Sequence, residues 1–196
     1  MSYIIAAIGY PGGSTLQPTS QYFHPLENYW CDLFGQKALN GQSNTVQELA
    51  LIATSLLCAS IAVFWYSLPK YFSPSPPIYK TIQYTGIISM FLALGVMTAF
   101  HDIAILISSL FSGIALLLTF SQLLKYQYYK LLVFGLLSSV LSTANFIVYY
   151  SEWGIEGLPL LQKITFIAFL SWFGIMSMVA LENGNIDLFK QKDNYG

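Results

Sequence analysis

Long apolar runs separated by short polar breaks dominate the chain. Five runs are nearly free of charge between their ends, and they cover residues 46–68, 81–100, 103–124, 129–150 and 160–181. A helix needs about 20 apolar residues to cross the roughly 30 Å of hydrocarbon in a bilayer, so each run is long enough to span it. The pattern predicts an all-α fold, a polytopic helical membrane bundle with five full transmembrane helices.

The breaks between these runs are of different kinds. Pro69, Pro74, Pro76 and Pro77 follow the first run, and proline does not fit inside a helix. His101 and Asp102 interrupt residues 81–124, which would otherwise form one helix of roughly 66 Å, about twice the membrane thickness. The chain is therefore expected to turn back there. Gly184 is placed as a helix C-terminal glycine, and the last span is predicted to stop at it.

The N-terminal stretch 1–10 is apolar but short. Ten helical residues rise only about 15 Å, half a bilayer, so this stretch is expected to be a half or truncated span. The sequence YPGGS at 10–14 is typical of a helix exit and turn. The expected organisation is the half-span at 1–10, an extracytoplasmic loop at 11–45, the five-helix bundle at 46–182 and a cytoplasmic polar tail at 183–196.

Lysine placement predicts the orientation. With alternating spans, one side of the membrane holds six of the eight lysines: Lys70, Lys80, Lys125, Lys130, Lys190 and Lys192. The other side holds only Lys37 and Lys163. Because cytoplasmic loops carry the excess of positive charge, the C-terminus is predicted to be cytoplasmic and the 11–45 loop extracytoplasmic. The chain is expected in the bacterial inner (cytoplasmic) membrane.

Composition excludes several functions. The net charge is −1 and only 9% of residues are charged, so the chain lacks the basic surface of a nucleic-acid binder. No Asp, Glu, Lys, Arg or His lies near the middle of a span, whereas proton and ion pathways usually need such a residue there. Cys31 and Cys58 are the two cysteines; Cys58 is expected inside the bilayer and Cys31 outside it, so no disulfide framework is predicted.

Helix packing is predicted from small residues. Gly135, Ser139 and Thr143 recur at four-residue spacing and would let two helices approach closely. Trp172 lies in the middle of the last span, away from both aromatic belts, and is expected to face another helix.

Polar groups gather on the predicted outer face and suggest a pocket there. The candidate pocket residues are His24, Glu27, Asp32, His101, Asp102, Asn145, Gln162 and Lys163. The first hypothesis is a pocket that binds a lipid or another small molecule. The aromatic residues of segment 21–44 would stay exposed unless this segment folds down over the outer ends of the spans, so we expect it to do so.

Other interpretations of these groups stay open. His24, Asp32, His101 and Asp102 could hold Zn²⁺ with a water, which would make the chain a metal-dependent membrane lipid hydrolase. The same four residues could instead do acid–base work without metal. No metal-binding spacing supports zinc, and no cofactor is predicted. Asp102 could instead cap the third span, and Lys163 could snorkel to the interface.

A third hypothesis is a structural subunit of a membrane complex. Whether the chain is an enzyme, and its oligomeric state, are left open.

Several short motifs are similar to those of an uncharacterised family of bacterial six-span membrane proteins. These motifs are YPGGS at 10–14, NYWCDL at 28–33, NGQSN at 40–44, His101-Asp102 and LPLLQK at 158–163. The resemblance covers nearly the whole chain, departs where most of the first helix is missing, and implies no activity. A more distant resemblance links Asn28-Tyr29 and 40–44 to the alkaline ceramidase-like hydrolases. Their site has three histidines, which a chain with two cannot supply.

Overall fold

The computed structural model describes residues 2–72 and 75–193, with side chains as far as residue 182. Within these ranges the regular elements are helical, apart from one isolated bridge between Lys37 and Ser43. The α-helices are α1 (Ser2–Ile8), α2 (Gln47–Ser67), α3 (Pro76–Ala93), α4 (His101–Lys125), α5 (Tyr129–Ser151) and α6 (Leu158–Asp193). Short 3-10 helices are η1 (Trp30–Phe34), η2 (Leu68–Tyr71), η3 (Leu94–Met97) and η4 (Ile155–Gly157). The all-α prediction is confirmed.

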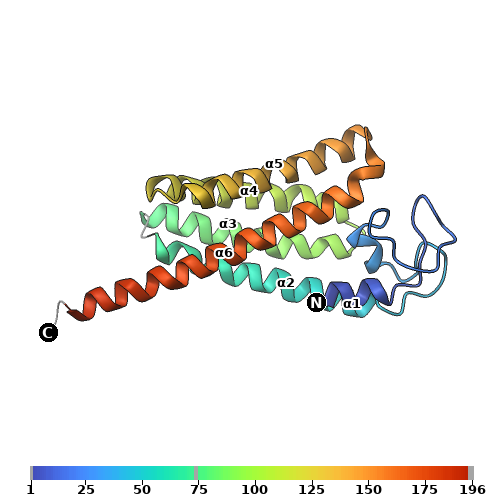
Figure 1. Ribbon diagram of the computed structural model, residues 1–196, viewed down its shortest axis with the longest axis horizontal. Helices are drawn as coiled ribbons and strands as arrows, with labels where there is room; N and C mark the ends of the chain where they lie inside the picture. Colours follow the sequence, from blue (N-terminus) through green and yellow to red (C-terminus); the bar gives the residue numbers. More distant parts are fainter. Residues whose placement is uncertain (1, 73–74, 194–196) are drawn as a thin grey trace.

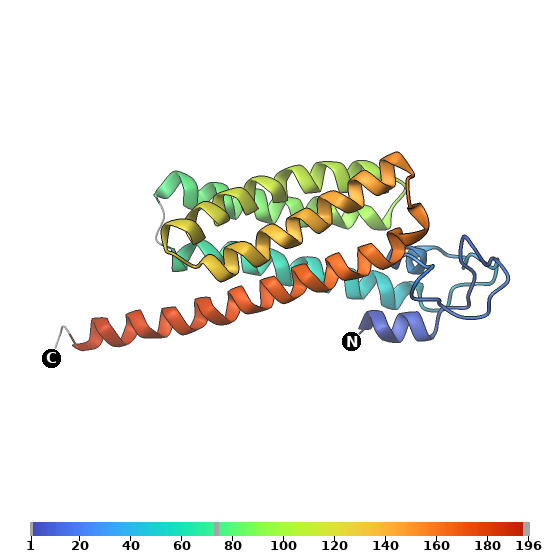
Figure 2. The same cartoon turned by 45° about the horizontal axis from the view of Figure 1, so that its top comes forward.

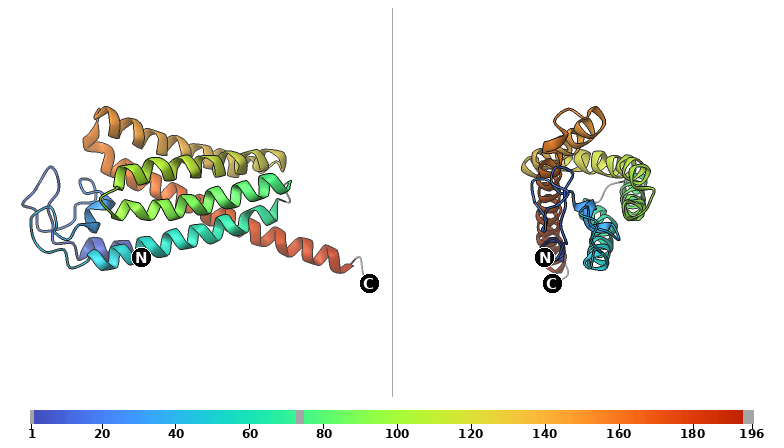
Figure 3. Two further views of the ribbon diagram at one scale, coloured as in Figure 1. Left: turned by 180° about the vertical axis from the view of Figure 1, so that it is seen from behind. Right: turned by 90° about the vertical axis from the view of Figure 1, so that its right-hand side faces the viewer.

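Five of these helices are long and apolar enough to cross a membrane, so the chain is a multi-pass membrane protein. They run up and down beside one another, and the chain from residue 9 to 46 is gathered at one end of the bundle (Figure 1). We call this end the loop end. Seen along the bundle axis, the helices follow one another around an open ring (Figure 3). Outward residues such as Leu110 and Leu117 are mostly exposed, as expected for side chains that meet lipid.

Two helix boundaries differ from the predicted ones. Helix α3 begins at Pro76, five residues before the predicted start at 81, because prolines are tolerated in the first turn of a helix, where the N–H has no partner. The chain turns back between the second and third spans as predicted, but the turn lies at 98–100, and His101 is the first residue of α4 instead of part of the break. Asp102 therefore lies in the first turn of α4, and Phe100 takes the capping position.

The prediction that the helix of the last span ends at Gly184 is wrong. The backbone of α6 continues to Asp193, so most of the 183–196 tail prolongs this helix away from the bundle (Figure 2). A glycine inside a helix lowers helix stability by only about 1 kcal/mol relative to alanine. Because no proline follows Gly184 in the sequence, the helix can continue past it.

Aromatic residues fill the core of the bundle. Trp172 is fully buried, and its indole N–H donates a hydrogen bond of 2.8 Å to the Leu131 carbonyl. A Cβ atom at Gly135 would lie 2.8 Å from the Trp172 indole nitrogen, so only glycine lets α5 and α6 approach this closely. The prediction that Trp172 faces another helix is confirmed.

A second, smaller core joins α1 and the loop to the first turn of α2. Its buried apolar members are Ala6, Tyr10, Phe23, Leu33, Ala38 and Ala50. The predicted helix exit is confirmed, since α1 ends at Ile8 and both Gly12 and Gly13 have positive φ angles, 118° and 86°. These conformations suit glycine and let the chain turn back over the bundle.

Candidate functional site

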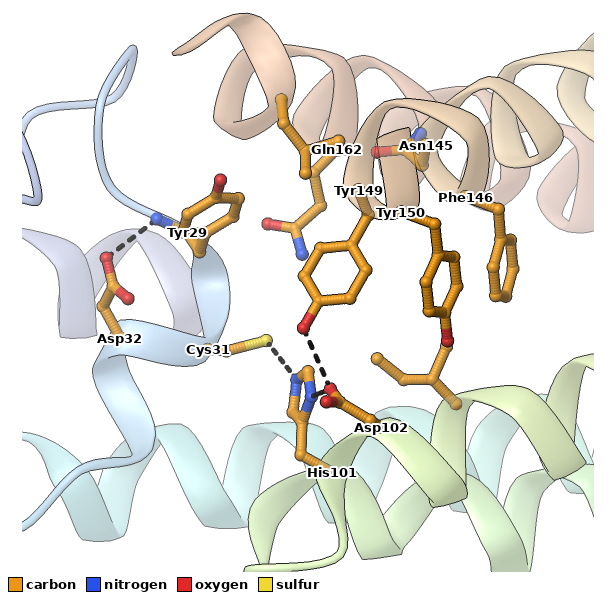
Figure 4. Close-up of a pocket in the computed structure, with 12 residues that line it drawn as sticks. Tyr29, Cys31, Asp32, His101, Asp102, Asn145, Phe146, Tyr149, Tyr150 and Gln162 are labelled. Atoms are coloured by element: carbon orange, nitrogen blue, oxygen red, sulfur yellow. Dashed lines mark hydrogen bonds and ion pairs between the residues drawn. The ribbon is translucent and has the colours of Figure 1, made fainter. Parts of the chain in front are cut away.

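A cavity of about 220 Å³ lies at the loop end of the bundle. Four segments form its wall: η1 and its preceding residue, the first turns of α4, the last turns of α5 and the start of α6 (Figure 4). Its lining residues are Tyr29, Cys31, Asp32, His101, Asp102, Ile105, Asn145, Phe146, Tyr149, Tyr150, Leu158 and Gln162. Aromatic and aliphatic groups make up much of this wall. The polar groups of Cys31, Asp32, His101 and Asp102 come from η1 and the start of α4, and the amides of Asn145 and Gln162 come from α5 and α6.

Hydrogen bonds within the loop fix the shape of η1. The Asp32 carboxylate accepts one hydrogen bond from the Tyr29 backbone N–H and one from the Asn28 amide, both at 2.9 Å. The Asn28 amide also donates to the Gly13 carbonyl at 2.7 Å. This local network directs the side chain of Cys31, the residue before Asp32, towards the helices (Figure 4).

The start of α6 holds η1 down onto the bundle. The Trp30 backbone N–H donates to the side-chain oxygen of Gln162 at 3.1 Å. The neighbouring Lys163 is only 9% exposed, and its ammonium donates to the carbonyls of Asn28 and Pro159. It also lies over the rings of Phe23 and Trp30, at 5.5 and 5.3 Å from their centroids. The expected folding of the 21–44 segment over the helix ends is confirmed.

A chain of polar contacts joins four of the residues that line the cavity. The Cys31 Sγ atom lies 3.2 Å from Nε2 of His101, and Nδ1 of the same ring lies 2.9 Å from Oδ1 of Asp102. The Tyr149 hydroxyl donates a hydrogen bond of 3.2 Å to that same carboxylate oxygen. Three helical segments, η1, α4 and α5, therefore supply one connected set of side chains (Figure 4).

The Asp102 carboxylate defines the tautomer of the His101 ring. An ionised carboxylate only accepts hydrogen bonds, so Nδ1 carries the hydrogen of this contact. In the neutral ring, Nε2 then presents its lone pair to the Cys31 thiol, which donates. The arrangement places a proton acceptor beside a sulfur nucleophile, with a carboxylate that orients the acceptor.

Burial controls the acidity of the loop groups in this site. Burial raises the pKa of the Cys31 thiol from 9.0 to about 11, the Asp32 carboxylate adds to the rise, and a hydrogen bond with Gln162 opposes it. Burial also raises the pKa of Asp32, against the hydrogen bonds from Asn28 and Tyr29, which lower it. Cys31 is therefore a neutral thiol at pH 7, not a preformed thiolate.

The cavity brings together five of the eight predicted site residues and leaves three outside. Asp32, His101, Asp102, Asn145 and Gln162 line it. His24 and Glu27 lie elsewhere in the loop, 3.5 Å apart, where Glu27 also accepts a hydrogen bond of 2.6 Å from Ser14. Lys163 anchors the loop through its contacts with Asn28 and the two rings.

The four residues considered as zinc ligands do not form one donor set. Among the described residues, no group of three or more His, Cys, Asp or Glu side chains is arranged to hold a metal ion. His101 and Asp102 contact each other, His24 pairs with Glu27, and the Asp32 carboxylate is occupied by Asn28 and Tyr29.

Sequence reasoning missed Cys31 and the aromatic wall of the cavity. The sequence predicts only that Cys31 lies outside the bilayer, and Tyr149 and Tyr150 are not among the predicted pocket residues. One signal was available: Cys31 and His101 lie on the same predicted side of the membrane, in a chain with only two cysteines and two histidines.

The chain matches no protein-family model, no curated protein and no solved structure. Its helices define the class of protein: an all-α, multi-pass membrane protein with a pocket at one end of its bundle.

Proposed function

We propose that the chain is a multi-pass protein of the bacterial cytoplasmic membrane that binds a lipid in an outward-facing pocket. The observation that carries this proposal is the cavity of about 220 Å³ at the loop end, with its aromatic side and its polar side. An amphipathic molecule fits such a wall, since its chain meets Phe146 and Tyr150 while its polar part meets His101 and Gln162.

The position of the cavity also favours a lipid. It lies where the ends of α4, α5 and α6 meet the loop, so its level along the bundle corresponds to the membrane–water interface. A lipid would keep its acyl chain in hydrocarbon and its ester groups beside the polar side chains. A structural subunit, the third hypothesis, needs no cavity at this end.

The outward orientation rests on the lysines. Lys70, Lys80, Lys125 and Lys130 belong to helix ends or short turns away from the loop end, whereas the loop end has Lys37 and the buried Lys163. The positive-inside rule then assigns the loop end to the extracytoplasmic side. The motifs at 10–14, 28–33 and 158–163 support membership of the uncharacterised six-span family proposed from the sequence.

Photo-crosslinking tests the lipid pocket. Full-length protein is reconstituted in nanodiscs that contain phosphatidylethanolamine with a diazirine on its acyl chain, and crosslinked residues are mapped by mass spectrometry. We expect crosslinks at Ile105 and Phe146, which Ile105→Trp removes by filling the cavity. The control Ile147→Trp, at an exposed position on α5, should leave them unchanged. Crosslinks that are unaffected by Ile105→Trp would overturn the proposal.

A further inference from the structure

Cys31, His101 and Asp102 have the connectivity of a nucleophile, a general base and a group that orients the base. The two contacts, 3.2 Å from sulfur to nitrogen and 2.9 Å from nitrogen to oxygen, are both within hydrogen-bond reach. We propose that Cys31 is an acyl-accepting nucleophile and that its substrate is a fatty-acyl ester of a membrane lipid. This inference rests on the proposed lipid pocket, whose lining includes the three side chains.

The lining of the cavity indicates the substrate class. An acyl chain that lies against Phe146 and Tyr150 would extend from the polar side, where the Cys31 sulfur is found. The carbonyl carbon of an ester is the junction between the apolar and polar parts of a lipid. It would therefore lie near the one nucleophilic sulfur in the cavity wall.

Gln162 can stabilise the charge that develops in such a reaction. Its side-chain oxygen accepts the Trp30 N–H, so its NH₂ group is directed into the cavity towards Cys31 and Tyr149 (Figure 4). An amide donor held beside the nucleophile can bind the oxyanion of a tetrahedral intermediate.

The chemical step balances without an oxidant or a metal. The Cys31 thiol gives its proton to Nε2 of His101 as sulfur attacks the ester carbonyl, and a carbon–sulfur bond forms. The tetrahedral intermediate then breaks its carbon–oxygen bond, and the imidazolium returns the proton to the departing alkoxide. The products are an alcohol and an acyl thioester on Cys31. Water or a second hydroxyl compound, deprotonated by His101, then releases the acyl group and regenerates the thiol.

The acidity of Cys31 agrees with this sequence of events. With its pKa raised to about 11, the thiol remains protonated until a base takes the proton. The reaction therefore depends on His101, as hydroxyl nucleophiles depend on their base. Asp102, with the Tyr149 hydroxyl on it, acts as a positioning residue for the ring.

Acyl transfer to Cys31 can be followed directly. Full-length protein in nanodiscs is incubated with phosphatidylglycerol radiolabelled in its acyl chains. Label that stays on the denatured protein and is released by neutral hydroxylamine reports the thioester. We expect labelling of wild type and of Cys58→Ser, the matched control for the other cysteine. Cys31→Ala should not be labelled, and His101→Gln should be labelled about 100-fold more slowly or worse.

The outcomes separate the two proposals. Unlabelled wild-type protein that still gives the pocket crosslinks would refute the nucleophile and leave the lipid pocket standing. Equal labelling rates for His101→Gln and wild type would refute the assigned base. Loss of both the label and the pocket crosslinks would refute the lipid pocket as well. Gel filtration and thermal unfolding of each variant establish that it is folded.

Discussion

The Sγ atom of Cys31 lies 3.2 Å from Nε2 of His101, although 70 residues separate the two in the sequence. The contact joins η1, in the loop, to the first residue of α4. It exists because Trp30 is tied to Gln162 and Asn28 to Lys163, which together press η1 onto the helix ends. The fold of the loop thus creates the site, and disturbing the loop should disturb the site.

Alkylation of Cys31 should have an unusual pH profile. With a pKa of about 11 instead of 9.0, its thiolate fraction at pH 9 is about 1%, against about half for an ordinary thiol. Raising the pH increases the thiolate, so the rate with iodoacetamide should keep rising towards pH 11. The control is an exposed thiol, Lys37→Cys in a Cys31→Ser background, whose rate should level off near pH 9–10. Identical profiles for the two thiols would contradict the burial of Cys31.

Replacing Lys163 should loosen the loop. Lys163→Met leaves the Asn28 and Pro159 carbonyls without their donor and removes the cation from the Phe23 and Trp30 rings. We expect the free energy of unfolding to fall by about 1–3 kcal/mol and proteolysis within residues 11–45 to become faster. Lys130→Met, at an exposed position, is the control and should change neither quantity. Proteolysis at the wild-type rate would show that Lys163 does not anchor the loop.

Truncating Trp172, in the bundle core, should lower the stability of the protein much more than truncating an exposed tryptophan. Trp172→Ala empties a fully buried site and removes the hydrogen bond to Leu131, so we expect a loss of about 3–5 kcal/mol in unfolding free energy. Trp153→Ala, at a residue that is 85% exposed, should cost less than about 1 kcal/mol. Denaturant titration in mixed micelles measures both, and equal losses would contradict the packing described for α6.

The orientation predicts a labelling pattern in intact cells. In a background without Cys31 and Cys58, an impermeant maleimide should label Lys37→Cys and Glu152→Cys at the loop end. Lys80→Cys and Lys125→Cys, at the opposite end, should react only after permeabilisation. The reverse pattern would place the pocket on the cytoplasmic side.

The helices could be predicted from the sequence because lipid imposes a strong and local rule. Each apolar run such as 129–150 must form a helix to satisfy its own backbone. Helix boundaries were harder to predict where one residue type can play two local roles. Proline can break a helix or begin one, as Pro76 and Pro77 begin α3, and Gly184 can end a helix or be tolerated within it.

The site could be predicted only in part. The polar groups at the loop end were identifiable because a run of apolar residues leaves few other places for chemistry. Which of these groups contact one another could not be predicted, because the contacts depend on how η1 turns and which side chains it directs towards the helices. Asp32 was expected to act on a ligand, yet it accepts bonds from Asn28 and Tyr29 and shapes the turn that presents its neighbour, Cys31.

Protection of Cys31 by lipid is the measurement that tests the account most directly, because it joins the pocket, the thiol and the ligand. The rate of Cys31 alkylation by N-ethylmaleimide is measured in detergent micelles with increasing phosphatidylglycerol, in a Cys58→Ser background. With lipid at ten times its half-saturating concentration, the rate should fall about tenfold. The exposed Lys37→Cys thiol, in a Cys31→Ser background, should keep its rate. A Cys31 rate that does not change with lipid would contradict the proposal that this pocket binds lipid beside Cys31.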